Sequence, residues 1–254
     1  MKLPPLWVAG PLPLATALAD SYRLWGGEAT IAADPTGIKE TERLLWLAPP
    51  ETDGGFPDLS GWQQAAASAP ARLPVALSNP QAAERFCLPL VVTARGILYG
   101  EAIGIAADHF WQPFSLSDKE RQQLYPFARS LVVQSPPGVS LVYFKIESAA
   151  VRFEKWLPFP DWPALATLGT QEPDLFACHW RCVLGLPIVD LQIHRPTFTA
   201  LLSEWPAHLL RQAALLPESR LYHFARMVQV QAPTVQRAHE QLRRLLATEP
   251  AFSL

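Results

Sequence analysis

The first 33 residues contain the pattern that most constrains the fold of this chain. A short apolar strand, a turn with several prolines, a helix and a second strand follow one another, which is the βαβ order of α/β proteins. Leu14, Leu18 and Tyr22 recur at helical spacing, and Gly26 with Gly27 predicts the end of that helix. The N-terminal third is therefore predicted to be α/β.

The same stretch also has features of a secretory signal peptide, because Lys2 precedes an apolar run that ends in Ala17–Ala19. Four prolines interrupt that run, however, and the helical spacing continues across the cleavage position. We therefore expect a folded element and a cytoplasmic protein. The three cysteines are too few for a disulfide framework, and we expect them to be reduced.

Composition excludes two broad classes of function. The formal net charge is −2 and no run of Lys and Arg occurs, so a nucleic-acid partner is not expected. No apolar stretch after the N-terminus is long enough for a membrane span. Nine tryptophans and a charged fraction of 17% indicate more aromatic and apolar surface than usual, which favours a protein partner or a homodimer.

The middle of the chain predicts consecutive strands. Residues 88–94 and 97–106 flank a hairpin turn, and Ser117 with Glu120 forms a capping box that begins a helix through 133. Residues 139–147 and 150–157 predict a second hairpin. The expected fold is mixed α/β (α+β), with an N-terminal βαβ unit followed by a largely antiparallel sheet with packed helices.

The last third predicts a helix over 173–184, a mostly helical segment over 197–216, a strand over 221–231 and a closing helix over 234–247. We divide the chain into a small α/β subdomain at 1–80 and a main domain at 81–254, which could also form one continuous domain.

Four charged residues of the second hairpin form the main candidate site. If Ser148 and Ala149 make the turn, alternation along the strands places four side chains on one face. They are Lys145, Glu147, Arg152 and Glu154. One interpretation is a solvated face with cross-strand ion pairs. The other is a cofactor site in which the cations bind phosphate oxygens and Glu154 binds a metal ion.

Two further patterns have both a chemical and a structural interpretation. Cys178, His179 and Cys182 could supply three zinc ligands from a helix, but the cysteines also continue an apolar stripe, which favours core packing. Glycines occur at 96, 100 and 104, which is no dinucleotide-binding pattern and favours bulges or close backbone contacts. His194, before Arg195 at a strand end, is the histidine that we single out.

The order of elements after residue 117 resembles the C-terminal half of an ATP-grasp ligase. In that family a strand of the type G-V-D-x-x leads to a return strand ending in E-x-N-x-x-P and then to a helix of the type L-F-x-x-H. The corresponding segments here are 138–142, 151–160 and 174–179. The resemblance implies an α/β scaffold that binds ATP with Mg²⁺.

Departures from the family pattern imply a depleted metal site. Ser140 stands where the family has an acidic residue, and Trp156 stands where it has a metal-binding asparagine. Glu154 is the ligand candidate that is left, and one carboxylate holds Mg²⁺ poorly.

Two functions from different classes follow. The first is a non-catalytic binding or assembly factor without a cofactor, which would act through aromatic surface such as the loops at 110–114 and 157–162. The alternative is an ATP-grasp-like nucleotide-binding ligase with a depleted metal site, which would use ATP and Mg²⁺ at the four hairpin residues. No catalytic residue can be named from the sequence.

Overall fold

The computed structural model describes residues 3–32, 43–47, 72–77, 83–133, 135–206 and 208–247. A small parallel sheet has the order β2 (Ala29–Ala32), β1 (Leu6–Ala9), β3 (Arg43–Trp46). The helices are α1 (Leu12–Leu24), α3 (Asp118–Val132), α4 (Leu175–Val183), α5 (Leu209–Ala214) and α6 (Val235–Leu246), with 3-10 turns η2 (Trp162–Thr167) and η3 (His223–Ala225). The sequence also predicts an exposed loop at 49–61 and a helix at about 61–69, and both segments lie outside the described residues.

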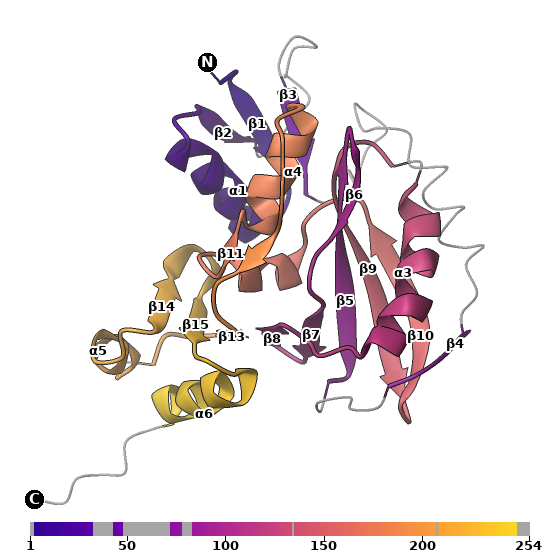
Figure 1. Cartoon of the computed structure of the whole chain (residues 1–254). Coiled ribbons are helices and arrows are strands. Elements are labelled where there is room, and N and C mark those ends of the chain that lie inside the picture. The colour runs from indigo at the N-terminus through magenta and orange to yellow at the C-terminus, as the bar shows by residue number, and fades with distance from the viewer. Residues whose placement is uncertain are drawn as a thin grey trace, which may run out of the picture.

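The large sheet is antiparallel throughout its described pairs (Figure 1). Its order is β14 (Ser219–Tyr222), β15 (Met227–Gln231), β13 (Thr197–Leu201), β8 (His109–Gln112), β7 (Ile103–Ala106), β5 (Arg85–Thr93), β9 (Gly138–Glu147), β10 (Ala150–Leu157), β4 (Arg72–Ala76), with β6 (Gly96–Tyr99) beside β5. Two short strands, β11 (Gln171–Glu172) and β12 (Gln192–Ile193), pair separately. The expected combination of a βαβ unit and a largely antiparallel sheet is confirmed.

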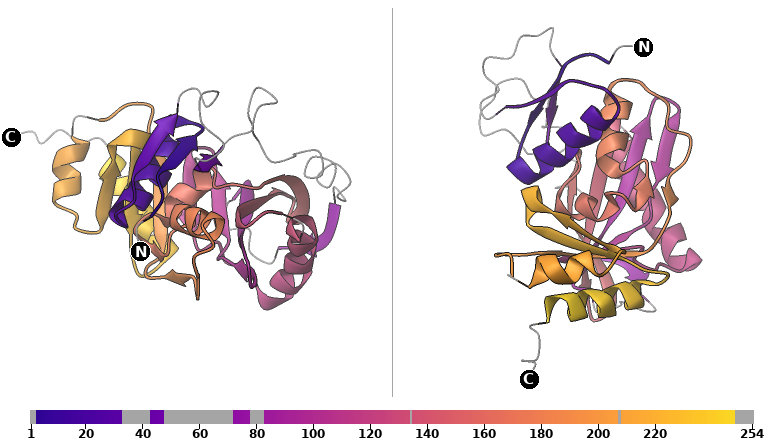
Figure 2. Two further views of the ribbon diagram at one scale, coloured as in Figure 1. Left: turned by 90° about the horizontal axis from the view of Figure 1, so that it is seen from above. Right: turned by 90° about the vertical axis from the view of Figure 1, so that its left-hand side faces the viewer.

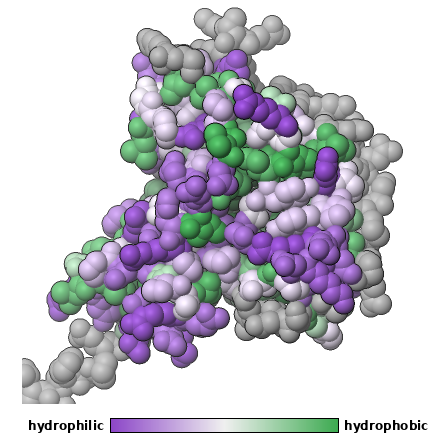
Figure 3. All heavy atoms as spheres, in the orientation of Figure 1, coloured by the Kyte–Doolittle hydropathy of each residue, from purple (hydrophilic) through white to green (hydrophobic). Residues whose placement is uncertain are grey.

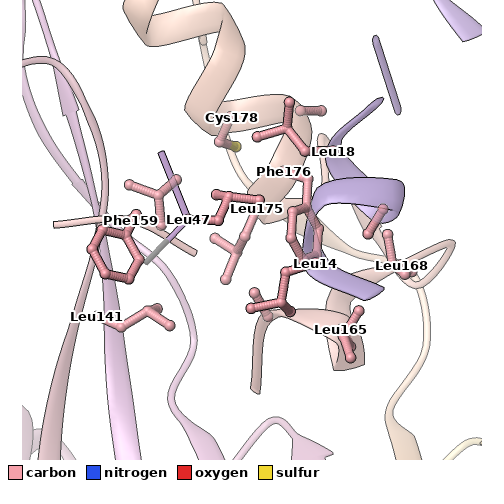
Figure 4. Packing of buried hydrophobic residues seen from close by; sticks show 14 of the residues in the cluster. Leu14, Leu18, Leu47, Leu141, Phe159, Leu165, Leu168, Leu175, Phe176 and Cys178 are labelled. Atoms are coloured by element: carbon pink, nitrogen blue, oxygen red, sulfur yellow. The ribbon is translucent and has the colours of Figure 1, made fainter. Parts of the chain in front are cut away.

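The large sheet separates two hydrophobic cores. Helices α1 and α4 and the η2 turn pack on one face, whereas α3 and α6 pack on the other (Figure 1). Strand β9 alternates between them, because Leu141 and Tyr143 belong to the first core and Val142 and Phe144 to the second. Figure 4 shows the first core, where Leu14 of α1, Leu141 of β9 and residues of α4 converge.

Helix α1 packs against α4 and joins the N-terminal unit to the rest of the chain (Figure 2). Trp180 is 1% exposed, its Nε1 donates a hydrogen bond to Ser21 Oγ at 3.2 Å, and its ring meets that of Tyr22 edge-on at 5.0 Å. The helix runs without interruption through residues 17–20. A cut after Ala19 would therefore divide a helix whose apolar side chains form part of a core. None of the helices within the described ranges is long and apolar enough to span a membrane.

Four local predictions were wrong. Residues 97–106 form two strands, β6 and β7, and residues 221–231 form the end of β14, the η3 turn and β15, where one strand each was predicted. Residues 197–216 are not mostly helical, because Thr197–Leu201 is strand β13 and inserts between β8 and β15, where its β-branched and aromatic residues complete the sheet. Residues 110–114 are not an exposed loop either. Phe110 and Trp111 lie in β8, and Phe114 is fully buried.

The close contact predicted at the glycines is confirmed at Gly104 and Gly100 but not at Gly96, where an added Cβ atom would meet no atom within 4 Å. A Cβ atom on Gly104 would lie 2.2 Å from the ring of Trp111, which is opposite Gly104 in the β7–β8 pair. At Gly100 a Cβ atom would lie 3.1 Å from Pro89. Gly100 and Gly104 serve packing rather than phosphate binding.

Candidate functional site: a charged strip on the sheet

The β9–β10 hairpin turns at Ser148 and Ala149, both of which have positive φ angles, of 49° and 67°. Lys145 lies directly opposite Arg152 in the antiparallel register. Since paired residues project to the same face of a sheet, these two cations are neighbours. Arg152 Nη1 lies 2.9 Å from Oε2 of Glu147, which is its diagonal neighbour on the same face of the hairpin.

Glu154 lies on the same face as Arg152, as alternation along the strand predicts, and a β-bulge follows at this position. The register shifts between Phe153, opposite Phe144, and Lys155, opposite Tyr143, so that Glu154 is the extra residue. Its Oε1 lies 3.6 Å from Nη1 of Arg85, a residue of β5 that is opposite Lys145 in the β5–β9 pair. The bulge therefore turns Lys155, the next residue, to the same face as Glu154.

An aspartate from the loop after β10 completes the cluster. Tyr143 Oη donates a 2.7 Å hydrogen bond to Asp161 Oδ2, and Lys155 Nζ lies 3.7 Å from the same oxygen and 4.5 Å from the centre of the Tyr143 ring. Burial raises the pKa of Tyr143 well above its ordinary value, and the negative charge of Asp161 raises it further. Tyr143 is thus a neutral donor that fixes Asp161.

We call this set of seven residues the charged strip. Its members are Arg85, Lys145, Glu147, Arg152, Glu154, Lys155 and Asp161. Three of its four cations have a carboxylate partner, whereas Lys145 forms no ion pair within the part of the chain that the structure describes. The strip has an excess of one positive charge and suits an anionic ligand such as a phosphate group.

Glu154 also offers an unused oxygen. Its Oε2 atom is buried and accepts no hydrogen bond from any described residue. A buried carboxylate oxygen without a donor is costly unless a cation lies beside it. Mg²⁺ prefers oxygen ligands of this kind, so the residue fits a metal ion bound through one carboxylate and otherwise through water and phosphate.

The two positions where the ATP-grasp pattern is broken lie on the opposite face of the sheet. Ser140 is opposite Leu90, and Trp156 is opposite Val142, and both partners belong to the core under α3. The acidic residue expected at 140 would therefore not have faced Glu154. Tyr143 and Lys145 are the β9 residues whose register partners, Lys155 and Arg152, flank Glu154 on its own face.

The zinc alternative at 178–182 finds no support. His179 Nδ1 accepts a 3.0 Å hydrogen bond from the Val139 N–H, and Cys178 Sγ donates to the Pro173 carbonyl oxygen at 3.5 Å. Within the described ranges no three His, Cys, Asp or Glu residues are grouped as a metal site. The core-packing interpretation accounts for both cysteines.

These contacts predict unreactive thiols. Burial raises the pKa of Cys87 and Cys178, and raises that of Cys182 to about 12, so little thiolate forms near neutral pH. We expect no measurable reaction of the native protein with Ellman's reagent and three reacting thiols after denaturation. Fast reaction of one thiol in the folded protein would show that one of these environments is wrong.

Comparison with known proteins confirms the ATP-grasp resemblance noted in the sequence at the level of the fold. The glycinamide-RNase-transformylase T of Mycobacterium tuberculosis superposes with a TM-score of 0.70 at 19% identity, covering 95% of this chain and 98% of that one. The N5-carboxyaminoimidazole synthetase of Staphylococcus aureus, complexed with ADP, gives a TM-score of 0.71 at 10% identity, with 97% and 98% covered.

A sequence relative points the same way. The formate-dependent phosphoribosylglycinamide formyltransferase of Haloquadratum walsbyi is 33% identical over 93 residues, which cover 36% of this chain but 23% of that protein. No family model matches the chain. The chain therefore corresponds to only part of the length of this relative.

These findings overturn the first of the two functions. A non-catalytic binding or assembly factor is not supported, because the relatives and the structural neighbours are ATP-grasp enzymes. The aromatic residues that suggested an interaction surface are largely internal, since Trp111, Phe114 and Phe159 are each at most 3% exposed. The expectation of no cofactor is likewise unsupported, since solved neighbours include complexes with ATP and with ADP.

Proposed function

We propose that this chain is an ATP-grasp-like nucleotide-binding ligase that holds ATP and Mg²⁺ on the charged strip. The observation that carries the proposal is the buried, unpartnered Oε2 of Glu154, whose Oε1 pairs with Arg85, the residue opposite Lys145. A single site then offers one oxygen ligand for a divalent cation and several cations for the phosphate oxygens.

Each strip residue has a distinct part in this proposal. Lys145 binds a phosphate oxygen as a point charge, and Arg85 orients the Glu154 carboxylate through its Oε1. Glu154 Oε2 binds Mg²⁺, which when present offsets the negative charge of the phosphates. Glu147 holds Arg152 in place at the turn end. With one carboxylate, the metal is bound mainly through the nucleotide.

A thermal-shift and calorimetric titration tests this function. At a hundredfold excess over its dissociation constant, MgATP should stabilise the folded chain by about 2.7 kcal/mol. Lys145→Ala should weaken MgATP binding at least about tenfold, because a charge-assisted contact contributes about 1.5–3 kcal/mol. Glu154→Gln should weaken binding only when Mg²⁺ is present, and so should abolish the difference between MgATP and ATP with EDTA.

Matched variants remove the same charges elsewhere. Lys119 on α3 and Glu204 in the loop after β13 are both exposed, and Lys119→Ala and Glu204→Gln should leave the MgATP affinity unchanged. Absence of any stabilisation at millimolar MgATP, with the parent chain folded, would refute nucleotide binding. Equal losses in the strip variants and the controls would refute the location.

A further inference from the structure

A second polar depression lies away from the charged strip, on the C-terminal strands of the large sheet. It is a cavity of about 510 Å³ between the start of β13, the end of β15 and the first turn of α6. Its lining is His194, Arg195, Pro196, Glu218, Gln231, Ala232, Pro233, Arg237 and Gln241. Strands β8, β7 and β5 separate β13 from the β9–β10 hairpin, so the two sites share no residue.

The walls of this cavity are fixed by the backbone. The Ala232 N–H donates to the Pro196 carbonyl oxygen at 3.0 Å, and the Gln231 N–H donates to that of Glu218, also at 3.0 Å. Thr234 caps α6, since its Oγ1 accepts a hydrogen bond from the Arg237 N–H. Main-chain bonds therefore hold together the segments that form this cavity.

The charges of the lining favour an anion. Arg195 and Arg237 form no ion pair with any residue in the described ranges, and Glu218 is the one carboxylate among the nine lining residues. The N-terminal end of α6 adds positive partial charge where Ala232 and Pro233 line the cavity. Figure 3 shows hydrophilic residues gathered over α6.

One buried atom indicates more than a bare anion. The Oε1 atom of Gln241 is buried and accepts no hydrogen bond from the described residues, although Gln241 lines the cavity. An acceptor left in this state needs a donor, which a ligand hydroxyl provides. The volume also exceeds that of a single phosphate and lies in the range of small-molecule sites.

From this arrangement we infer that the cavity binds a phosphate monoester, with Arg195 and Arg237 on the phosphate oxygens and Gln241 Oε1 accepting from a ligand hydroxyl. Arginine suits this role because its planar guanidinium presents paired N–H donors to phosphate. His194, the histidine singled out from the sequence, also lines this cavity.

The test follows backbone amide signals of the full chain by NMR during titration with inorganic phosphate, AMP and ribose 5-phosphate. We expect saturable shifts at the first turn of α6, near Val235 and Gln236. Arg195→Gln and Arg237→Gln should each weaken binding at least about tenfold, whereas Arg244→Gln, on the same helix but outside the lining, should not. Tighter binding of the organic phosphates than of inorganic phosphate identifies a phosphorylated metabolite, and equal binding identifies free phosphate.

Two results would overturn the inference. One is the absence of α6 shifts with all three probes at millimolar concentration, and the other is an equal effect of the Arg195, Arg237 and Arg244 variants. Both arginines of the site are exposed, so unchanged melting temperatures should show that the variants fold. Lys145→Ala, which tests the charged strip, should leave the α6 shifts intact, so the inference and the proposed function can fail separately.

Discussion

Replacing Trp180 by alanine should lower the free energy of unfolding by about 3–5 kcal/mol, which is a large part of the stability of a domain. The indole is almost fully buried between α4 and α1, and it contacts Tyr22 edge-on while donating to Ser21. Its removal leaves a cavity and an unpaired hydroxyl at the joint between the N-terminal unit and the large sheet. Urea denaturation measures the change.

A conservative variant separates the two parts of this effect. Trp180→Phe keeps an aromatic ring against Tyr22 but loses the N–H donor to Ser21. We expect it to lose roughly 1–3 kcal/mol, less than the alanine variant. A Trp180→Ala variant as stable as the parent would mean that α1 does not pack on α4 as described.

His179→Ala should cost about 3 kcal/mol at neutral pH, because it removes a buried ring and leaves the Val139 N–H without its acceptor. His179→Asn should cost less, since an amide oxygen can occupy the place of Nδ1. If His179→Asn is no more stable than His179→Ala, the hydrogen bond to Val139 contributes little to stability.

The same residue should make the protein sensitive to acid. Burial lowers the pKa of His179 from 6.5 to about 4, so between these values the unfolded chain binds a proton that the native chain does not. The contribution of the neutral His179 ring to the free energy of unfolding is therefore fully present above pH 6.5. It is lost as the pH falls toward 4, by about 3 kcal/mol in total. The loss should be absent in His179→Asn.

A nearby carboxylate acts in the opposite direction. Burial raises the pKa of Asp174 from 3.8 to about 6, so protonation of this group favours the native state as the pH falls through that window. Asp174 keeps part of its side chain exposed, and we expect its contribution to be the smaller one. His179→Asn should thus be less destabilised by acid than the parent chain, and greater acid loss in this variant would contradict the assignment.

Local sequence signals predicted the βαβ unit, the capping box at Ser117 and the β9–β10 hairpin, because each depends on neighbours in the chain. The placement of Lys145 opposite Arg152 follows from the same period of two. Strand β13 could not be predicted, because Thr197–Leu201 becomes a strand only by pairing with segments some ninety residues earlier and thirty later.

The other contacts of the charged strip could not be predicted for the same reason, because they depend on the register between strands. Arg85 reaches Glu154 through the register of a different strand, and Lys155 reaches Asp161 because a bulge turns two successive residues to one face. A strict alternation would have placed Lys155 on the opposite face from Glu154. The sequence signal that could have found Asp161 is its position in the loop that follows the strand carrying Glu154, but nothing in the spacing indicated Tyr143 as its donor.

Strand β9 contributes side chains to both cores, so its release from the sheet would be costly. Its side chains alternate between the layer under α1 and α4 and the layer under α3, and it pairs with β5 on one side and β10 on the other. Local fluctuation that released this strand would expose both layers to water at once, at a free energy close to that of global unfolding. Lys145 and Tyr143 therefore stand on a strand that is held by a partner on each side, so we expect the charged strip to be preorganised rather than assembled when a ligand arrives.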